Sequence, residues 1–267
     1  DVDLLTYLYQ WLGEKGFDYT IAGVNHCIWI TRATLHGEDM IPRIRQYTID
    51  HRDMKPNEAE YSATANYNAA KFALCRTFGY LPIVGDRHLV EFWPSLCNQR
   101  NGFAMKYDVT KTTVDSRRHR ADKSREEIER IARGDQEIDW SPSGEEMTSI
   151  MNAILTGTTV RCVLNLPNRG QIINLPEDRV VETLGNVSSD GAEAEAAGDL
   201  PGAIGSLCRL HTDVHEMTLD AALTGDRDLA VQAMSLDPLS AAADFSEIAA
   251  MTDELLLANR EWMPRFA

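Results

Sequence analysis

The alternation of apolar and polar residues along the chain predicts several helices. Residues 143–157, "SGEEMTSIMNAILTG", give the clearest pattern, because Ser143 and Glu146 can form a capping box ahead of an apolar stripe. A stripe of this kind predicts a helix that packs against a core, and it consists of Met147, Ile150, Met151, Ile154 and Leu155. Helical spacing also marks residues 4–12 and 61–78, and three segments after residue 200 that are separated by "TGDRD" and "LDPL".

Two short runs rich in β-branched and aromatic residues, "YTIAGV" and "CIWITRAT", predict strands on either side of Asn25 and His26. Residues 158–185 alternate β-branched runs with Pro, Asn and Gly, which predicts two or three more strands joined by tight turns. We therefore expect an α+β fold, in which helices surround a small, mostly antiparallel sheet built from residues 18–34 and 158–185. The acidic, low-complexity stretch 188–199, "SSDGAEAEAAGD", is predicted to be a surface loop.

One long segment, residues 112–133, carries charges at most of its positions. Its only large apolar residues are Val114, Ile128 and Ile131. This pattern predicts a helix that is either solvated or placed between subunits. A cluster of arginines within it (Arg117, Arg118 and Arg120) is an alternative anion site, but a solvated face is the favoured interpretation.

The composition is that of a globular protein that can bury a sizeable core. The chain has 267 residues, of which 43% are hydrophobic and 25% charged. Its formal net charge of −15 argues against a nucleic-acid or anionic-membrane surface, which needs clustered Lys and Arg. No apolar stretch approaches the about 20 residues of a membrane span, and no signal-peptide pattern occurs. Five cysteines without a C-x-x-C pair fit a reducing compartment, so we expect a cytoplasmic protein.

Several common catalytic motifs are absent from the sequence. There is no G-x-G-x-x-G, no G-x-x-x-x-G-K-[ST] and no G-x-S-x-G, so the chain as given lacks a nucleotide-phosphate cradle and a nucleophile elbow. His211 and His215 are four residues apart in "HTDVHE" and could hold a metal from one helix face. They flank an apolar stripe, however, and we interpret them as surface or packing histidines.

Two polar interruptions of apolar segments are the strongest candidates for chemistry. In "IAGVNHCIWI", Asn25 and His26 lie within an otherwise apolar run, where a core histidine is the default interpretation. Cys27 is not expected to join His26 as a ligand, because adjacent residues of a strand point to opposite faces. In "GDRHLVEF", four ionisable residues stand between apolar runs, namely Asp86, Arg87, His88 and Glu91. This arrangement fits a pocket rim and a buried ion-pair network equally well.

These segments together resemble a known family. The order "AGVNHCIWI", "GYLPIVGDRHLVEFWP", "LNLPNRGQIINLPEDRVVE" and "LTGDRDLAVQAMSLDP" is similar to that in the C-terminal part of glycoside hydrolase family four, and "GDRHLVEF" is most similar to its α-galacturonidase type. The resemblance covers nearly the whole chain. It implies NAD and a divalent metal, usually Mn²⁺, as cofactors, and an exception to paired-carboxylate hydrolysis. Hydride is taken from C3 of the sugar, a base removes the C2 proton, the glycosidic oxygen leaves by elimination, water adds, and the hydride is returned.

The resemblance also implies roles for individual residues. His26 is expected to be a ligand of the metal that chelates the sugar hydroxyls, and Asn25 to line the substrate site. Asp86 is expected to be the base at C2, with Tyr67 held in reserve. Arg87, with His88 beside it, is predicted to pair with the C6 carboxylate of a galacturonide. An internal ion pair of Arg87 with Asp86 or Glu91 is the competing interpretation.

The family pattern implies partners that this chain does not contain. We expect residues 1–267 to form the C-terminal domain that binds substrate and metal and mediates homo-oligomer formation. The NAD-binding Rossmann domain and a cysteine metal ligand have no counterpart in front of Asp1. Three alternatives stay open: another family-four α-glycosidase specificity, a dehydrogenase-like enzyme acting on 2-hydroxy acids, and a non-catalytic assembly domain.

Overall fold

The computed structural model describes residues 8–9, 11–52, 68–109, 112–141 and 146–266. Its centre is an antiparallel sheet whose main strand order is β3-β2-β1-β6-β5. The described strands are β1 (Asp18–Val24), β2 (Cys27–Leu35), β3 (Glu38–Asp39), β4 (Leu81–Pro82), β5 (Val160–Pro167), β6 (Val180–Ser188) and β7 (Gly191–Ala194). β4 pairs with β2, and β7 pairs with β6. The predicted α+β fold and the two predicted sheet regions are therefore confirmed.

Strands β1 and β2 form a hairpin that joins at a two-residue turn, Asn25–His26. Their pairing runs without interruption from Ile21, opposite Ile30, to Val24, opposite Cys27. The register shifts only between Thr20 and Ile21, which lie opposite Arg32 and Ile30, so the extra residue at this bulge or irregularity is Thr31 of β2.

On its other side β1 pairs with β6, which comes from a distant part of the sequence. Ala22 lies opposite Thr183, and Gly23 lies opposite Glu182. β6 also pairs with β5 along its length, and there Glu182 faces Asn165. The end of the β1–β2 hairpin therefore lies beside polar residues of β5 and β6.

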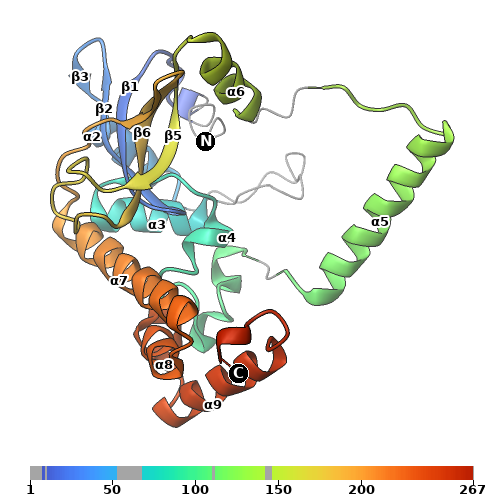
Figure 1. The fold of residues 1–267 in the computed structure, drawn as a ribbon. Helices are drawn as coiled ribbons and strands as arrows, with labels where there is room; N and C mark the ends of the chain where they lie inside the picture. Colours follow the sequence, from blue (N-terminus) through green and yellow to red (C-terminus); the bar gives the residue numbers. More distant parts are fainter. Residues whose placement is uncertain (1–7, 10, 53–67, 110–111, 142–145, 267) are drawn as a thin grey trace.

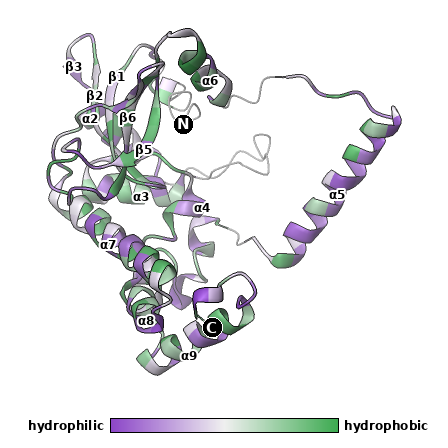
Figure 2. Cartoon of the chain, viewed as in Figure 1, coloured by the Kyte–Doolittle hydropathy of each residue, from purple (hydrophilic) through white to green (hydrophobic). Residues whose placement is uncertain are grey.

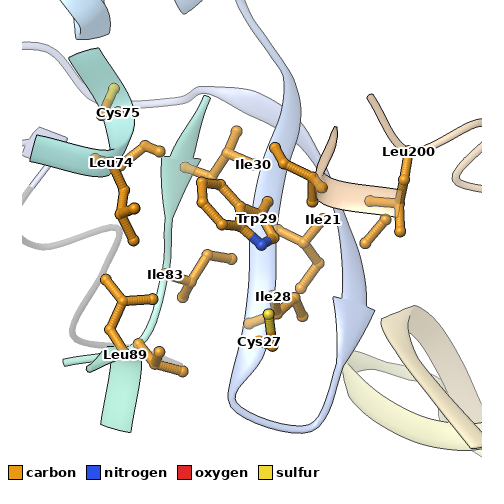
Figure 3. Close-up of a cluster of buried hydrophobic side chains, with 14 of the residues drawn as sticks. Ile21, Cys27, Ile28, Trp29, Ile30, Leu74, Cys75, Ile83, Leu89 and Leu200 are labelled. Atoms are coloured by element: carbon orange, nitrogen blue, oxygen red, sulfur yellow. The ribbon is translucent and has the colours of Figure 1, made fainter. Parts of the chain in front are cut away.

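The core lies where β2 packs against two helices, which comprise residues 41–50 and 69–78. Trp29 and Ile30 are both fully buried although they are adjacent in the strand, so β2 is covered on both faces. Figure 3 shows Trp29 surrounded by side chains from β1, β2 and the segment after β4, including Ile83. Each fully buried aliphatic or aromatic side chain here contributes about 1.5–3 kcal/mol.

The helices lie beside the sheet or pack on one another, except for the helix of residues 114–133, which stands apart from the sheet (Figure 1). The described ones are α2 (Ile41–Asp50), α3 (Ala69–Phe78), α4 (Asp86–Leu89), α5 (Val114–Arg133), α6 (Met147–Thr156), α7 (Gly202–Thr224), α8 (Arg227–Leu236) and α9 (Phe245–Ala258). Helix α3 packs on α2, α4 and β4, while α7 packs on β1 and α8, and α8 packs on α9 (Figure 1). The three helices predicted after residue 200 are thus confirmed. No helix of the described residues has the length and apolar character needed to cross a membrane.

Helix α5 agrees with the prediction for a charged helix, because it has no buried residue and its surface is mostly hydrophilic (Figure 2). Helix α6 confirms the helix predicted there, ended by Gly157, but not the predicted burial of its apolar stripe. Only Ala153 is buried, and the apolar stripe is exposed, with Leu155 81% accessible. Helix α6 begins at Met147 with Glu146 as a cap that makes no side-chain hydrogen bond, and Ser143 lies outside the described residues. The expectation that the stripe packs on a core of this chain was wrong.

The acidic stretch 188–199 was also predicted wrongly in part. Residues Gly191–Ala194 form β7, which pairs back on β6 from Gly185 to Ser188. The alternation of Ala and Glu that suggested low complexity is also an alternation of period two. It fits an exposed edge strand as well as a loop.

Candidate functional site

The Asn25–His26 turn is exposed at one end of the sheet, held there by buried neighbours on both sides. Val24 and Cys27 are fully buried, whereas Asn25 and His26 are exposed. His26 has φ of +63°, a left-handed conformation that is uncommon for a residue other than glycine. The default interpretation of His26 as a core histidine is therefore wrong. The apolar flanks are buried, but the imidazole between them is exposed.

A glycine beneath the turn permits the close approach of the two strands. A Cβ atom placed on Gly23 would lie 2.1 Å from the carbonyl oxygen of Cys27. That same carbonyl accepts a hydrogen bond from the thiol of Cys208 on α7, at 3.6 Å. The Cys27 side chain is buried, and helix α7 contacts the main chain next to the turn.

His26 meets His88 although 61 residues separate them in the chain. The two imidazole rings are stacked, with centroids 4.5 Å apart and planes at 7°. Partial desolvation, and then the nearby His88, lower the pKa of His26 below its ordinary 6.5, while Glu91 opposes the shift. A neutral imidazole is the form that binds metal ions.

The "GDRH" segment begins the short helix α4, and its three ionisable residues and the nearby Glu91 have different environments. His88 and Glu91 are exposed, and the His88 Nδ1 atom lies 3.6 Å from a carboxylate oxygen of Glu91. Arg87 donates a hydrogen bond to the Thr112 hydroxyl at 2.6 Å. The segment therefore brings His88 to His26, while Arg87 is directed to the chain before α5.

Asp86 is buried, with an accessibility of 1%. Its two carboxylate oxygens accept the backbone N–H groups of Ala70 (2.8 Å) and Lys71 (3.0 Å), at the start of α3. The Lys71 ammonium is also buried and donates to the carbonyl of Ile83 at 3.1 Å. Burial raises the pKa of Asp86 to about 7 from its ordinary 3.8, and Lys71 and the N–H donors oppose this shift. Asp86 thus joins α4 to α3, and Tyr67, the alternative base, lies outside the described residues.

Two residues that the sequence did not single out border the turn from the neighbouring strands. The backbone N–H of His26 donates to the Glu182 carboxylate at 3.3 Å, and the Asn25 amide donates to the Asn165 side chain at 3.5 Å. Burial raises the pKa of Glu182, while the His26 N–H and the Asn165 side chain lower it. The available signal was that Glu182 is the single ionisable residue in the strand "VVETLGNV".

The chemistry of these side chains fits one ligand of a metal site. His26 is exposed, its pKa is lowered, and its ring is oriented by the turn. Among the described residues, no group of three or more His, Cys, Asp or Glu side chains converges to hold a metal. His26 therefore remains a predicted metal ligand, with no second protein ligand beside it among the described residues.

The second histidine pair takes the structural role expected of it. His211 is buried and packs edge-on against Phe92, with ring centroids 4.8 Å apart. His215 is exposed one helical turn later, 6.5 Å from His211 between ring centroids. The surface-or-packing interpretation is confirmed.

Comparison with known proteins places the chain in a class of glycosidases. Residues 21–240 match the model of the family 4 glycosyl hydrolase C-terminal domain, and the chain belongs to this family. It is 31% identical over 252 residues to an α-galacturonidase of Lachnoclostridium phytofermentans. This alignment covers 92% of this chain and 54% of that protein. It is also 31% identical over 226 residues to an α-galacturonidase of Bacillus subtilis, covering 82% and 49%. The chain thus spans about half the length of these relatives.

Solved structures agree with this placement. A crystal structure of lplD from Bacillus subtilis matches with a TM-score of 0.85 and 28% identity, over 96% of this chain and 60% of that one. A 6-phospho-α-glucosidase from gut microorganisms, solved with NAD and Mn²⁺, matches with a TM-score of 0.71 over 96% and 58%. At 19% identity the second match shows the fold alone.

Proposed function

We propose that this chain is the sugar- and metal-binding half of an NAD-dependent α-galacturonidase. The observation that carries the proposal is the exposed Asn25–His26 turn, whose His26 ring stacks on His88 of the "GDRH" segment. The two α-galacturonidases among the relatives support the substrate class, a small sugar-acid glycoside. When bound, NAD would accept and return a hydride, and Mn²⁺ would polarise the sugar hydroxyls.

The residues of this chain would bind and orient the substrate. His26 would supply a metal ligand, and Asn25, exposed beside it, would contact the sugar. Arg87 and His88, which leave the same short helix, would recognise the C6 carboxylate, for which a guanidinium is a planar two-pronged donor. No sequence in this chain can cradle a dinucleotide, so we assign none of its residues to NAD.

Asp86 is proposed as the group that takes the C2 proton. Its pKa near 7 suits a base that works at neutral pH. Its buried position and its two backbone hydrogen bonds require the carboxylate to leave the start of α3 before it can reach a substrate. Asp86→Asn, followed by exchange of the substrate C2 hydrogen with deuterated solvent, tests the role. Wild-type exchange would move the role to Tyr67.

The proposal includes two partners and a compartment. A nucleotide-binding half would complete the enzyme, and further copies of the chain would form an oligomer in the cytoplasm. Support comes from the apolar stripe of α6, because Met147, Met151, Ile154 and Leu155 are all exposed. Light scattering on the protein that contains this chain and its nucleotide-binding half measures the oligomer directly.

The experiment for the function is an assay of that same protein on a chromogenic α-galacturonide. We expect hydrolysis that requires both NAD and Mn²⁺, and turnover of the matching α-galactoside at least about tenfold slower. Equal turnover of both substrates would overturn the galacturonide specificity and leave the glycosidase. Hydrolysis of neither would overturn the proposed function.

A further inference from the structure

The Asn25–His26 turn requires support because its second residue has an unfavourable backbone conformation. His26 has φ of +63°, and the side chain of any L-residue disfavours this region. The buried pair Val24 and Cys27 fixes the two ends of the turn, and the His26 ring packs against His88. Polar contacts from the neighbouring strands add support at the two turn residues themselves.

Glu182 makes the contact at the residue where the strain lies. Its carboxylate accepts the backbone N–H of His26 itself, at 3.3 Å. The position of Glu182 follows from strand register, since it lies opposite Gly23 of β1, three residues before His26. On its other side it lies opposite Asn165 of β5.

Asn165 extends this support to the other turn residue. Its side-chain oxygen accepts from the Asn25 amide at 3.5 Å. Glu182 and Asn165 thus hold both residues of the turn, one through its main chain and the other through its side chain. Both contacts come from strands about 140 or more residues away in the sequence, so local turn preference does not supply them.

We infer that Glu182 is a positioning residue that holds the Asn25–His26 turn in its left-handed form and thereby directs the His26 ring outward, next to His88. The inference rests on the proposed function insofar as it links Glu182 to metal binding. The hydrogen bond is to the main chain of His26, which leaves the imidazole nitrogens available. Residues that orient a metal ligand in this way commonly change metal affinity by about 10- to 100-fold when removed.

The experiment compares Glu182→Ala with Glu182→Gln in the protein that contains this chain and its nucleotide-binding half. Glutamine keeps an oxygen that accepts the His26 N–H, whereas alanine removes it. Glu193→Ala is the matched control, because Glu193 is an exposed carboxylate on β7, the strand that also pairs with β6. Two quantities are measured: hydrogen exchange at the His26 amide without metal, and Mn²⁺ affinity by calorimetry.

We expect Glu182→Ala to speed exchange at His26 about tenfold and to weaken Mn²⁺ binding about tenfold or more. Glu182→Gln should stay within about threefold of the wild type in both, and Glu193→Ala should match the wild type. Unchanged exchange at His26 in Glu182→Ala would overturn the inference. Loss of Mn²⁺ binding in Glu182→Gln as large as in Glu182→Ala would also overturn it, since Glu182 would then be a metal ligand.

The measurements separate this inference from the function on which it rests. If the wild type bound no Mn²⁺, the proposed function would fail, while faster His26 exchange in Glu182→Ala would still support the positioning role. If Mn²⁺ bound through His26 but Glu182→Ala left exchange unchanged, only the positioning role would fail.

Discussion

The Asn25–His26 turn and the "GDRH" segment look alike in the sequence, since each places ionisable or amide side chains within an apolar run. In the structure they differ in where the leading polar group goes. His26 is exposed, with its ring against His88, whereas Asp86 is buried with both carboxylate oxygens bonded to the start of α3.

The difference follows from the local backbone. A two-residue hairpin turn leaves its residues outside the strand pairing, so their side chains leave the sheet. Asp86 instead is the first residue of a short helix that packs on another helix whose N–H groups need acceptors. A polar residue in an apolar run can therefore have two different environments. At a hairpin turn, as for His26, it is exposed, whereas beside a helix end, as for Asp86, it is buried and hydrogen-bonded to main-chain N–H groups.

The largest effect that separates the two segments should be a dependence of stability on pH. The folded protein keeps the Asp86 proton up to about pH 7, whereas an unfolded aspartate releases it near 3.8. Protonated Asp86 therefore stabilises the folded protein fully below about pH 4. This contribution to the free energy of unfolding, roughly 4 kcal/mol at most, is lost as the pH rises through 7. We expect the difference in unfolding free energy between wild type and Asp86→Asn, from urea titrations, to fall over that range. A constant difference from pH 4 to pH 7 would contradict it.

Removing the buried carboxylate should destabilise the fold. We expect Asp86→Ala to lower the free energy of unfolding by about 3 kcal/mol, because two N–H groups of α3 lose their acceptor and the buried Lys71 loses its nearby carboxylate. Asp190→Ala, at an exposed position, is the control and should change it by less than about 0.5 kcal/mol. Urea unfolding at pH 7.5 measures both, and a loss below about 1 kcal/mol for Asp86→Ala would count against its structural role.

Removing the exposed imidazole should have the opposite profile. We expect His26→Ala to weaken Mn²⁺ binding by about 100-fold while changing unfolding by less than about 0.5 kcal/mol. The control is His36→Ala, since His36 is also exposed with positive φ, at 52°. Calorimetric titration of the protein with its nucleotide-binding half measures the affinity. Equal binding by wild type and His26→Ala would remove His26 from the metal site.

The smallest effect concerns selectivity within the "GDRH" segment. Arg87→Ala should slow turnover of an α-galacturonide about tenfold more than turnover of an α-galactoside, since only the first carries a carboxylate for the guanidinium. Arg100→Ala, at another exposed arginine, is the control. The ratio of kcat/KM for the two substrates is the measurement. An equal loss on both would assign Arg87 to its contact with Thr112 instead.

Much of the fold could be predicted from the sequence, because its signals are local. The apolar, β-branched run around Trp29, the glycines that end α3, α5 and α6, and the breakers before α8 and α9 mark elements where local pattern and packing agree. The stripe of α6 was misjudged because its residues show only that a face is apolar, and not which molecule covers it.

The candidate site was predictable only in part. The pairing of the Asn25–His26 turn with the "GDRH" segment could be inferred from the family resemblance. Burial of ionisable residues in this segment was one of its two open interpretations, and it is confirmed for Asp86. The partners of Asp86 could not be predicted, because they are main-chain groups of Ala70 and Lys71, which leave no trace in the sequence. Glu182 was missed for a similar reason, since its contact with His26 depends on strand register between residues 156 positions apart.

The bulge at Thr31 of β2, opposite the step from Thr20 to Ile21 in β1, gives this sheet a place where the chain can change its length. Between the bulge and the turn, every residue of β1 has a fixed partner in β2, and an added residue there would reverse which side chains face the core. At the bulge the pairing is already offset, so an added residue alters the far end of the hairpin and leaves His26 in its place. Divergence among relatives can therefore accumulate at one end of these two strands while the other end keeps its geometry.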